Sequence, residues 1–207
     1  TIVHHYVPEE ILHAADILPW RITGSYLESA PLAEAHRTSI SCRFGTHMLE
    51  AFLRKDIPAL DGIVCVDIDD DVRTMLDVVI YCEMAPFIHM MHLPHKRGTE
   101  LVVRFWLSEL ERLRHAVEEV TGVKVTDEKL VESIDIYNKT RQLFAEIYEM
   151  RKQDAPPLTG SEVLKLVGAA SVMRKETFNG YLEELMPYIK TRKPNYPARA
   201  PRVLVSG

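Results

Sequence analysis

The chain has 207 residues, of which 46% are hydrophobic and 27% are charged, and its formal net charge is −5 at pH 7. This composition is typical of a globular protein with one large domain or two small ones, and the acidic excess disfavours a nucleic-acid partner. No apolar stretch reaches the roughly 20 residues of a membrane-spanning helix. The three cysteines lack CxxC spacing, which disfavours a disulfide framework and favours the reducing cytoplasm.

Apolar runs alternate with helical periods in residues 1–98. The pattern predicts strands at Ile2–Val3, Pro19–Gly24, Gly62–Val66 and Pro86–Met91, and helices that begin at Pro8 or cover Thr46–Arg54 and Asp70–Glu83. Repeated strand–helix–strand units imply a mostly parallel sheet with right-handed crossovers. We therefore expect residues 1–98 to form an α/β segment with a three-layer, Rossmann-like architecture.

Helical periodicity takes over in residues 99–192, which we interpret as a helical insertion. Four helices are predicted: Thr99–Thr121, Thr126–Lys152, one that begins with a capping box at Thr159–Glu162, and Lys175–Ile189. Residues 193–207 contain a proline-rich linker and a β-branched run, Val203–Val205, followed by Ser-Gly. Because a chain rarely stops at such a strand, we expect a fragment, with this strand opening a following α/β domain that is missing.

The sequence contains no GxGxxG or P-loop pattern, so we do not expect the chain to hydrolyse ATP itself. Cys42 lies at a predicted loop-to-helix junction, and helix N-termini favour the thiolate that a metal ligand or nucleophile requires. The alternative for Cys42 is a small buried residue. Cys65, inside a strand, and Cys82, late in a helix, are predicted to be structural.

An acidic run, Asp67–Asp71, directly follows the strand that ends at Val66. Ligands of open α/β sheets bind just outside the carboxyl ends of the strands, where carboxylates handle cations or protons. The alternative for these acids is capping of the next helix. His5 and Glu9 follow the first strand and His95 follows another. We therefore predict that all three gather with Cys42 and Asp69 at one edge of the sheet.

Seven short motifs occur in a characteristic order along the chain. They are His4–Ala15 (HHYVPEEILHAA), Ser41–Phe44 (SCRF), Leu60–Val64 (LDGIV), Leu93–Lys96 (LPHK), Tyr137–Arg141 (YNKTR), Pro156–Val163 (PPLTGSEV) and Arg202–Gly207 (RVLVSG). Together they resemble the family of 2-hydroxyacyl-CoA dehydratases and benzoyl-CoA reductases. The match is to the N-terminal portion of a subunit of the 2-hydroxyglutaryl-CoA dehydratase D-component type.

The resemblance implies a subunit with two Rossmann-like domains that pairs with a related sister subunit. It implies an acyl-CoA substrate, a [4Fe–4S] cluster, and a separate ATP-dependent iron–sulfur activator that delivers electrons. Cys42 matches one cluster cysteine of the family. Asp69 stands where a second is expected, and a third would lie beyond Gly207. Because a carboxylate is a harder ligand than a thiolate, this departure puts an ordinary cluster in doubt.

The leading hypothesis is a subunit of an oxygen-sensitive acyl-CoA dehydratase or aromatic acyl-CoA reductase, inactive as a fragment. In this hypothesis His5 and Glu9 are catalytic, Asp69 and His95 bind substrate, and Cys42 binds metal. The alternative is a non-catalytic, cluster-free scaffold subunit that binds a cluster-bearing sister. A generic nucleotide-binding domain is a third possibility, against which the missing glycine loop argues.

Overall fold

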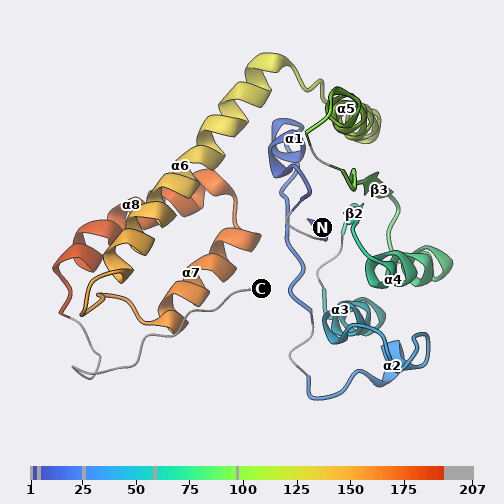
Figure 1. Ribbon diagram of the computed structural model, residues 1–207, viewed down its shortest axis with the longest axis horizontal. Helices are drawn as coiled ribbons and strands as arrows, with labels where there is room; N and C mark the ends of the chain where they lie inside the picture. Colours follow the sequence, from blue (N-terminus) through green and yellow to red (C-terminus); the bar gives the residue numbers. More distant parts are fainter. Residues whose placement is uncertain (1, 4–5, 25–26, 58–59, 97, 194–207) are drawn as a thin grey trace. The chain divides into compact units, whose positions relative to one another are not determined.

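The structure, a computed structural model, describes residues 2–3, 6–24, 27–57, 60–96 and 98–193 (Figure 1). The chain forms two compact units, residues 1–127 and 128–207. The first contains strands β1 (Ile2–Val3), β2 (Ile63–Asp67) and β3 (Ile88–His92) and helices α1 (Glu9–Ala14), α2 (Pro31–Glu34), α3 (Arg43–Leu53), α4 (Asp70–Tyr81) and α5 (Glu100–Thr121). The second contains α6 (Asp127–Arg151), α7 (Gly160–Val172) and α8 (Lys175–Thr191).

The three described strands form one parallel sheet in the order β1–β2–β3. Helices alternate with these strands along the chain, so the predicted α/β class is confirmed, whereas a three-layer Rossmann-like architecture is not established by this small sheet. The predicted strand at 19–24 is wrong. Arg21 makes a single isolated bridge, Pro19 has no N–H to donate to a ladder, and Gly24 turns the chain with φ 85°. The predicted strand at 203–205 lies outside the described residues.

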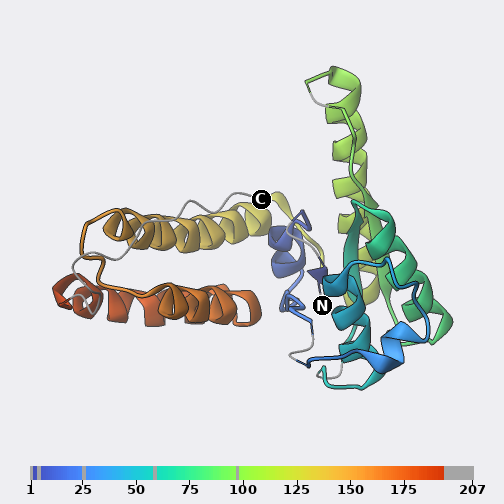
Figure 2. The same ribbon diagram turned by 60° about the horizontal axis from the view of Figure 1, so that its bottom comes forward.

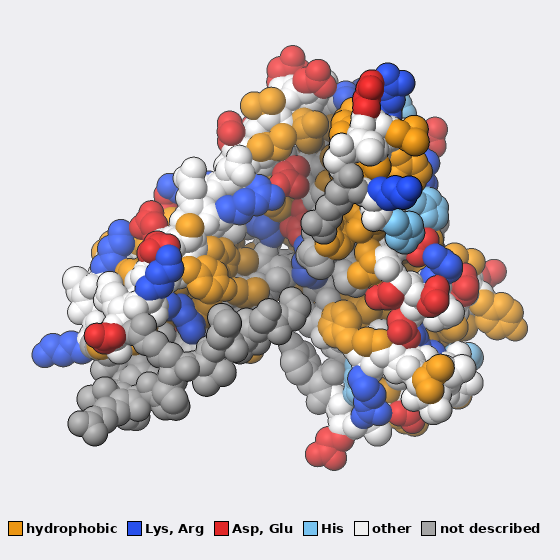
Figure 3. All heavy atoms as spheres, viewed as in Figure 1, with side chains coloured by type: hydrophobic (Ala, Val, Ile, Leu, Met, Phe, Trp, Pro, Cys, Tyr) orange, Lys and Arg blue, Asp and Glu red, His pale blue; other side chains and the backbone are white. Residues whose placement is uncertain are grey.

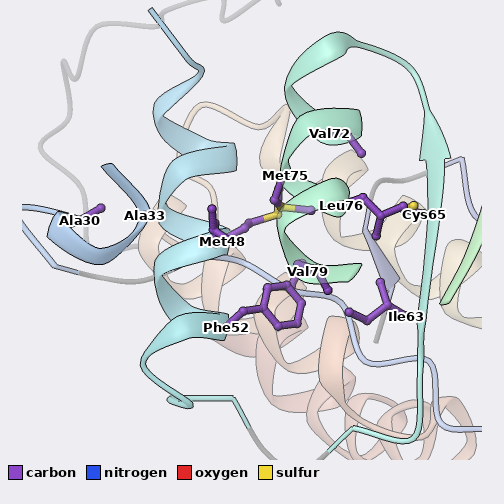
Figure 4. Close-up of a cluster of buried hydrophobic side chains, with 12 residues drawn as sticks. Ala30, Ala33, Met48, Phe52, Ile63, Cys65, Val72, Met75, Leu76 and Val79 are labelled. Carbon is purple, nitrogen blue, oxygen red and sulfur yellow. The ribbon is translucent and has the colours of Figure 1, made fainter. Parts of the chain in front are cut away.

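One face of the sheet is covered by α3 and α4. Side chains alternate along a strand, so Ile63 and Cys65 of β2 share a face with Ile88 and Met90 of β3. Figure 4 shows part of the resulting core, in which Met48 of α3 reaches toward Met75 of α4. The buried members of this core are Ile22, Ala30, Ala33, Met48, Leu49, Phe52, Ile63, Cys65, Val72, Met75, Leu76 and Val79.

The other contacts of β3 come from α5. In the described sheet β3 is an edge strand, whose outer backbone groups need partners from elsewhere. Glu109 accepts a hydrogen bond from the His92 amide at 2.7 Å, and Arg112 donates to the Met90 carbonyl. These two side chains join α5 to the edge of the sheet. The helix ends at Gly122, whose φ of 70° is favourable for glycine.

The second unit is built from α6, α7 and α8, and α6 and α8 run alongside each other in Figures 1 and 2. The predicted capping box is confirmed, because Thr159 and Glu162 exchange hydrogen bonds at the start of α7. Lys175 is buried and donates to the Ala170 carbonyl at 2.5 Å, where a cation suits the end of α7. Among the described residues, no helix is both long enough and apolar enough to cross a membrane.

The predicted division into segments 1–98, 99–192 and 193–207 stays a prediction. The structure adds one fact: α5, at the start of the predicted insertion, contacts β3 and α1.

Candidate functional site

Cys42 lies at the N-terminus of α3, as predicted, and its side chain is exposed. Its backbone N–H donates to Asp71 Oδ1 at 2.8 Å. Because α3 leads into β2 and α4 leaves it, the N-termini of both helices lie at the carboxyl end of β2. The structure therefore brings Cys42 and the acidic loop together at this edge of the sheet.

A buried arginine joins the two helix N-termini. Arg37 donates to Asp71 Oδ1 at 2.5 Å and to the Asp71 carbonyl at 3.1 Å, and its side chain is only 2% exposed. A Cβ at Gly45 would lie 3.4 Å from Arg37 Nη1, so glycine leaves the guanidinium room against the first turn of α3. Asp71 thus binds the guanidinium and the Cys42 amide with one oxygen. These contacts fix the backbone that carries the Cys42 thiol.

Asp69 is the N-cap of α4, and its carboxylate accepts a hydrogen bond from the Val72 amide at 2.8 Å. The capping interpretation of the acidic loop is therefore confirmed for Asp69. Capping is sufficient to explain an aspartate at this position, since aspartate is among the most favoured N-cap residues. A role in substrate binding remains a prediction.

An Asp69→Asn variant is expected to unfold with almost unchanged free energy, because asparagine caps helices about as well as aspartate. An Asp69→Ala variant should lose about 0.5–2 kcal/mol, because the Val72 amide loses its acceptor. Urea denaturation of the 207-residue chain measures both. Asp70→Ala is the matched control, since the Asp70 side chain is 93% exposed. Equal losses for Asn and Ala at position 69 would contradict the capping role.

Asp67 and His92 end the two neighbouring strands β2 and β3 and face each other in register. Asp67 Oδ2 lies 3.3 Å from His92 Nδ1, and Arg73 Nη2 lies 2.9 Å from each carboxylate oxygen of Asp67. Burial alone would raise the pKa of Asp67, but the hydrogen bonds from Arg73 and His92 outweigh it and lower that pKa. Neither Arg73 nor His92 was among the predicted site residues. The sequence did contain a pattern that could have pointed to this pair, because each of the two strands ends in a titratable residue.

Glu109 binds the amide of the last residue of β3, and His89 is the second residue of that strand. Burial alone would raise the pKa of Glu109, but hydrogen bonds from Arg112 and the His92 amide outweigh it and lower that pKa. Burial, reinforced by the charge of Arg112, lowers the pKa of His89 to about 4. His89 is therefore neutral at physiological pH. Its Nε2 is buried without a hydrogen-bond partner in the described part of the chain.

The other two cysteines do not join Cys42. Cys65 is fully buried, and burial followed by the charge of Asp67 raises the pKa of its thiol to about 12. The predicted core position of Cys65 is confirmed. Cys82 is the C-cap of α4, at the opposite end of that helix from Asp69. The described residues therefore place one thiol at the carboxyl edge.

A [4Fe–4S] cluster is usually held by about four cysteine thiolates. The single Cys42 thiol does not meet that requirement, so the described residues do not fit a complete cluster by themselves. Within the described ranges, no three His, Cys, Asp or Glu side chains gather closely enough to hold a metal ion.

The remaining predicted site residues have different outcomes. His5 lies outside the described residues. Glu9 begins α1 and pairs with Arg21 at 2.5 Å. His95 is exposed in the loop that follows β3. The structure thus shows direct contact between Cys42 and the acidic loop, whereas the gathering of His5, Glu9 and His95 around Cys42 stays a prediction.

Residues 4–207 match the family described as 2-hydroxyglutaryl-CoA dehydratase, D-component. The match covers nearly the whole chain, and the chain belongs to this family.

Three curated relatives show the breadth of that family. One of the benzoyl-CoA reductase subunits of Thauera aromatica is 28% identical over 183 residues, covering 87% of this chain and 47% of that protein. The beta subunit of (R)-2-hydroxyglutaryl-CoA dehydratase of Acidaminococcus fermentans is 26% identical over 183 residues, covering 87% and 48%. The beta subunit of lactoyl-CoA dehydratase of Anaerotignum propionicum is 26% identical over 202 residues, covering 98% and 53%. The chain spans about half the length of these relatives.

Proposed function

We propose that this chain is part of one subunit of an oxygen-sensitive, iron–sulfur acyl-CoA dehydratase or aromatic acyl-CoA reductase. A separate ATP-dependent activator protein supplies its electrons. The proposal rests on the family and on relatives that are subunits of acyl-CoA dehydratases and a benzoyl-CoA reductase. The observation in the structure that carries it is the position of Cys42.

Capping does not account for a cysteine at position 42. The favoured N-cap residues are Ser, Thr, Asp and Asn, and the Cys42 side chain makes no capping hydrogen bond. Its thiol is exposed at the N-terminus of α3. The Arg37–Asp71 contact fixes the backbone behind it. These features suit a metal ligand.

In this proposal the remaining cluster ligands come from outside the described residues, because the carboxyl edge offers one thiol. Asp69 and His95 bind the acyl-CoA substrate, and His5 and Glu9 are its catalytic residues. The alternative is a cluster-free scaffold subunit that binds a cluster-bearing sister. One observation favours the alternative. Asp69 stands where the family is expected to have a second cysteine, and its side chain caps α4.

A sister subunit is supported by the exposed apolar side chains of α5. Leu101 is 77% exposed, Val103 56%, Phe105 41% and Leu107 51%. Apolar side chains appear over this helix in Figure 3, and Figure 2 shows one end of α5 extending beyond the rest of the first unit. Exposed apolar surface of this kind is typical of protein interfaces. The three cysteines are unpaired, which suits the reducing cytoplasm that we propose as its location.

The test is anaerobic purification of the complete subunit, alone and together with its sister. Iron and acid-labile sulfide are measured in each sample, and acyl-CoA turnover is followed with the activator and ATP. The enzyme hypothesis predicts iron in this subunit and turnover by the pair, with none by the 207-residue chain. Iron found in the sister alone would support the scaffold alternative. Absence of iron and turnover in the pair would overturn both.

A further inference from the structure

We infer that Glu109 and Arg112 of α5 close the outer edge of β3 against a further β-strand. The pair occupies backbone hydrogen bonds through which another strand would join the described sheet at that edge. When the pair is removed, the partner that fits the open edge is β3 of a second copy of this chain. Neither a cofactor nor a substrate is needed for this role, so it goes beyond the proposed function.

Alternate residues of β3 turn their backbone groups away from β2. The Phe87 carbonyl accepts a hydrogen bond from the Ile63 amide at 2.8 Å, so this carbonyl faces β2. Successive residues of a strand point their N–H and C=O groups to opposite sides. The outward groups of β3 therefore belong to Ile88, Met90 and His92. We call these groups the β3 edge, and the described sheet has no strand beside it.

Two side chains of α5 bind the middle of the β3 edge. Glu109 Oε2 accepts a hydrogen bond from the His92 amide at 2.7 Å, and Arg112 donates to the Met90 carbonyl. In a parallel sheet, a residue opposite Met91 would make the same two bonds, because its carbonyl would accept from position 92 and its amide would donate to position 90. The Glu109–Arg112 pair therefore reproduces the hydrogen bonds of one residue of a neighbouring strand.

The pair is held firmly in this position. Arg112 Nη2 lies 2.6 Å from Glu109 Oε2, so each side chain binds the other as well as the strand. Burial alone would raise the pKa of Glu109, but the hydrogen bonds lower it, so the carboxylate is ionised at neutral pH. Hydrogen bonds to charged groups are the stronger kind. Leu113 and Val117, which are 0% and 1% exposed, anchor the following turns of α5. The closed edge is therefore the stable state of the first unit.

A bare β3 edge would be a site of unwanted pairing. Unpaired N–H and C=O groups along an edge strand recruit strands of other chains, and natural proteins cover such edges with helices or charged side chains. Here α5 supplies both the helix and the charges. A further strand of the complete subunit would have to join this sheet elsewhere than beside β3.

The open edge would be complementary to itself. A two-fold axis at Met90 would place the outward N–H groups of one β3 opposite the outward C=O groups of the other, in antiparallel order. Ile88 of one copy would then lie opposite His92 of the second copy. The five residues of β3 match the usual length of a strand, so the pairing would use the whole element.

Sedimentation velocity of the 207-residue chain over a range of concentrations tests the closure. The double variant Glu109→Ala/Arg112→Ala should self-associate more tightly than the parent by about tenfold or more, because several backbone hydrogen bonds form between the opened edges. The matched control is Arg104→Ala/Glu111→Ala, which removes the same charges from exposed positions of the same helix and should behave like the parent. Parent-like association of the double variant would overturn the inference.

Hydrogen exchange at single-residue resolution identifies the surface that pairs. In the parent the His92 amide should exchange slowly, because Glu109 accepts its hydrogen bond. In the double variant this amide should exchange faster at low concentration, and the amides of Ile88, Met90 and His92 should become protected as the dimer forms. Protection confined to another surface, or slow His92 exchange in the monomeric double variant, would contradict the assignment.

Circular dichroism and urea denaturation show whether each variant folds. If the double variant does not fold, Arg112→Ala alone is decisive. It removes a side chain that is 44% exposed and frees the Met90 carbonyl. This single variant should still associate more tightly than the parent, whereas Glu109→Gln should behave like the parent, because the amide oxygen can accept from His92. Parent-like association of a folded Arg112→Ala would overturn the inference. Iron and turnover enter none of these measurements, so their outcome is independent of the proposed function.

Discussion

Replacing Met75 with alanine is expected to lower the free energy of unfolding of the first unit by about 2–5 kcal/mol. Met75 is 0% exposed and lies at the centre of the core between α3, α4 and the sheet. In Figure 4 its side chain meets that of Met48. The truncation removes buried apolar surface and leaves a cavity that two packed helices cannot readily close.

Urea denaturation followed by tryptophan fluorescence measures this loss. The chain has two tryptophans, Trp20 and Trp106, and both belong to the first unit. The matched control is Ile80→Ala in the same helix, because the Ile80 side chain is 51% exposed and removes little buried surface. Equal destabilisation by the two substitutions would contradict the described core.

Replacing Cys42 with serine is expected to separate folding from metal binding. The free energy of unfolding should stay constant or rise by up to about 1 kcal/mol, because serine is a favoured N-cap and cysteine forms no capping bond here. Iron bound by the complete subunit should fall by more than about tenfold, because a hydroxyl is a poor substitute for a thiolate. Turnover should fall with it.

Iron and sulfide analysis of the anaerobically purified subunit tests this expectation, with Cys82→Ser as the matched control. Cys82 lies at the far end of α4 and should be dispensable for iron. Full iron content and turnover in Cys42→Ser would remove Cys42 from the site. If the parent itself contains no iron while its sister does, the scaffold alternative applies and Cys42 is not a ligand in this subunit.

Several features were accessible from the sequence because they depend on neighbours within a few residues. The capping box at Thr159 and Glu162 and the N-cap at Asp69 are such features. So is the helix predicted at Thr46–Arg54, although it begins earlier than predicted, at Arg43, just after Cys42. Local hydrogen bonding and hydrophobic periodicity determine them, and both can be read along the chain. The same periodicity separated the β2 and β3 region from the helices that follow.

The local sequence pattern also predicted one strand wrongly. The segment 19–24 alternates like a strand, but it makes only one bridge, at Arg21. Trp20 packs against the core, and Arg21 pairs with Glu9. Alternation shows which side chains are buried, whereas strand pairing also requires a partner with free backbone groups.

The sequence by itself determined the family, the α/β class and the position of Cys42 at a helix start. Only the tertiary structure decided which side chains surround that position. The Arg37–Asp71 contact joins residues 34 apart, the Asp67–His92 contact 25 apart, and the bond from the His92 amide to Glu109 17 apart. Such pairs form only when strand register and helix packing place distant backbone segments side by side, and one sequence read locally does not contain that register.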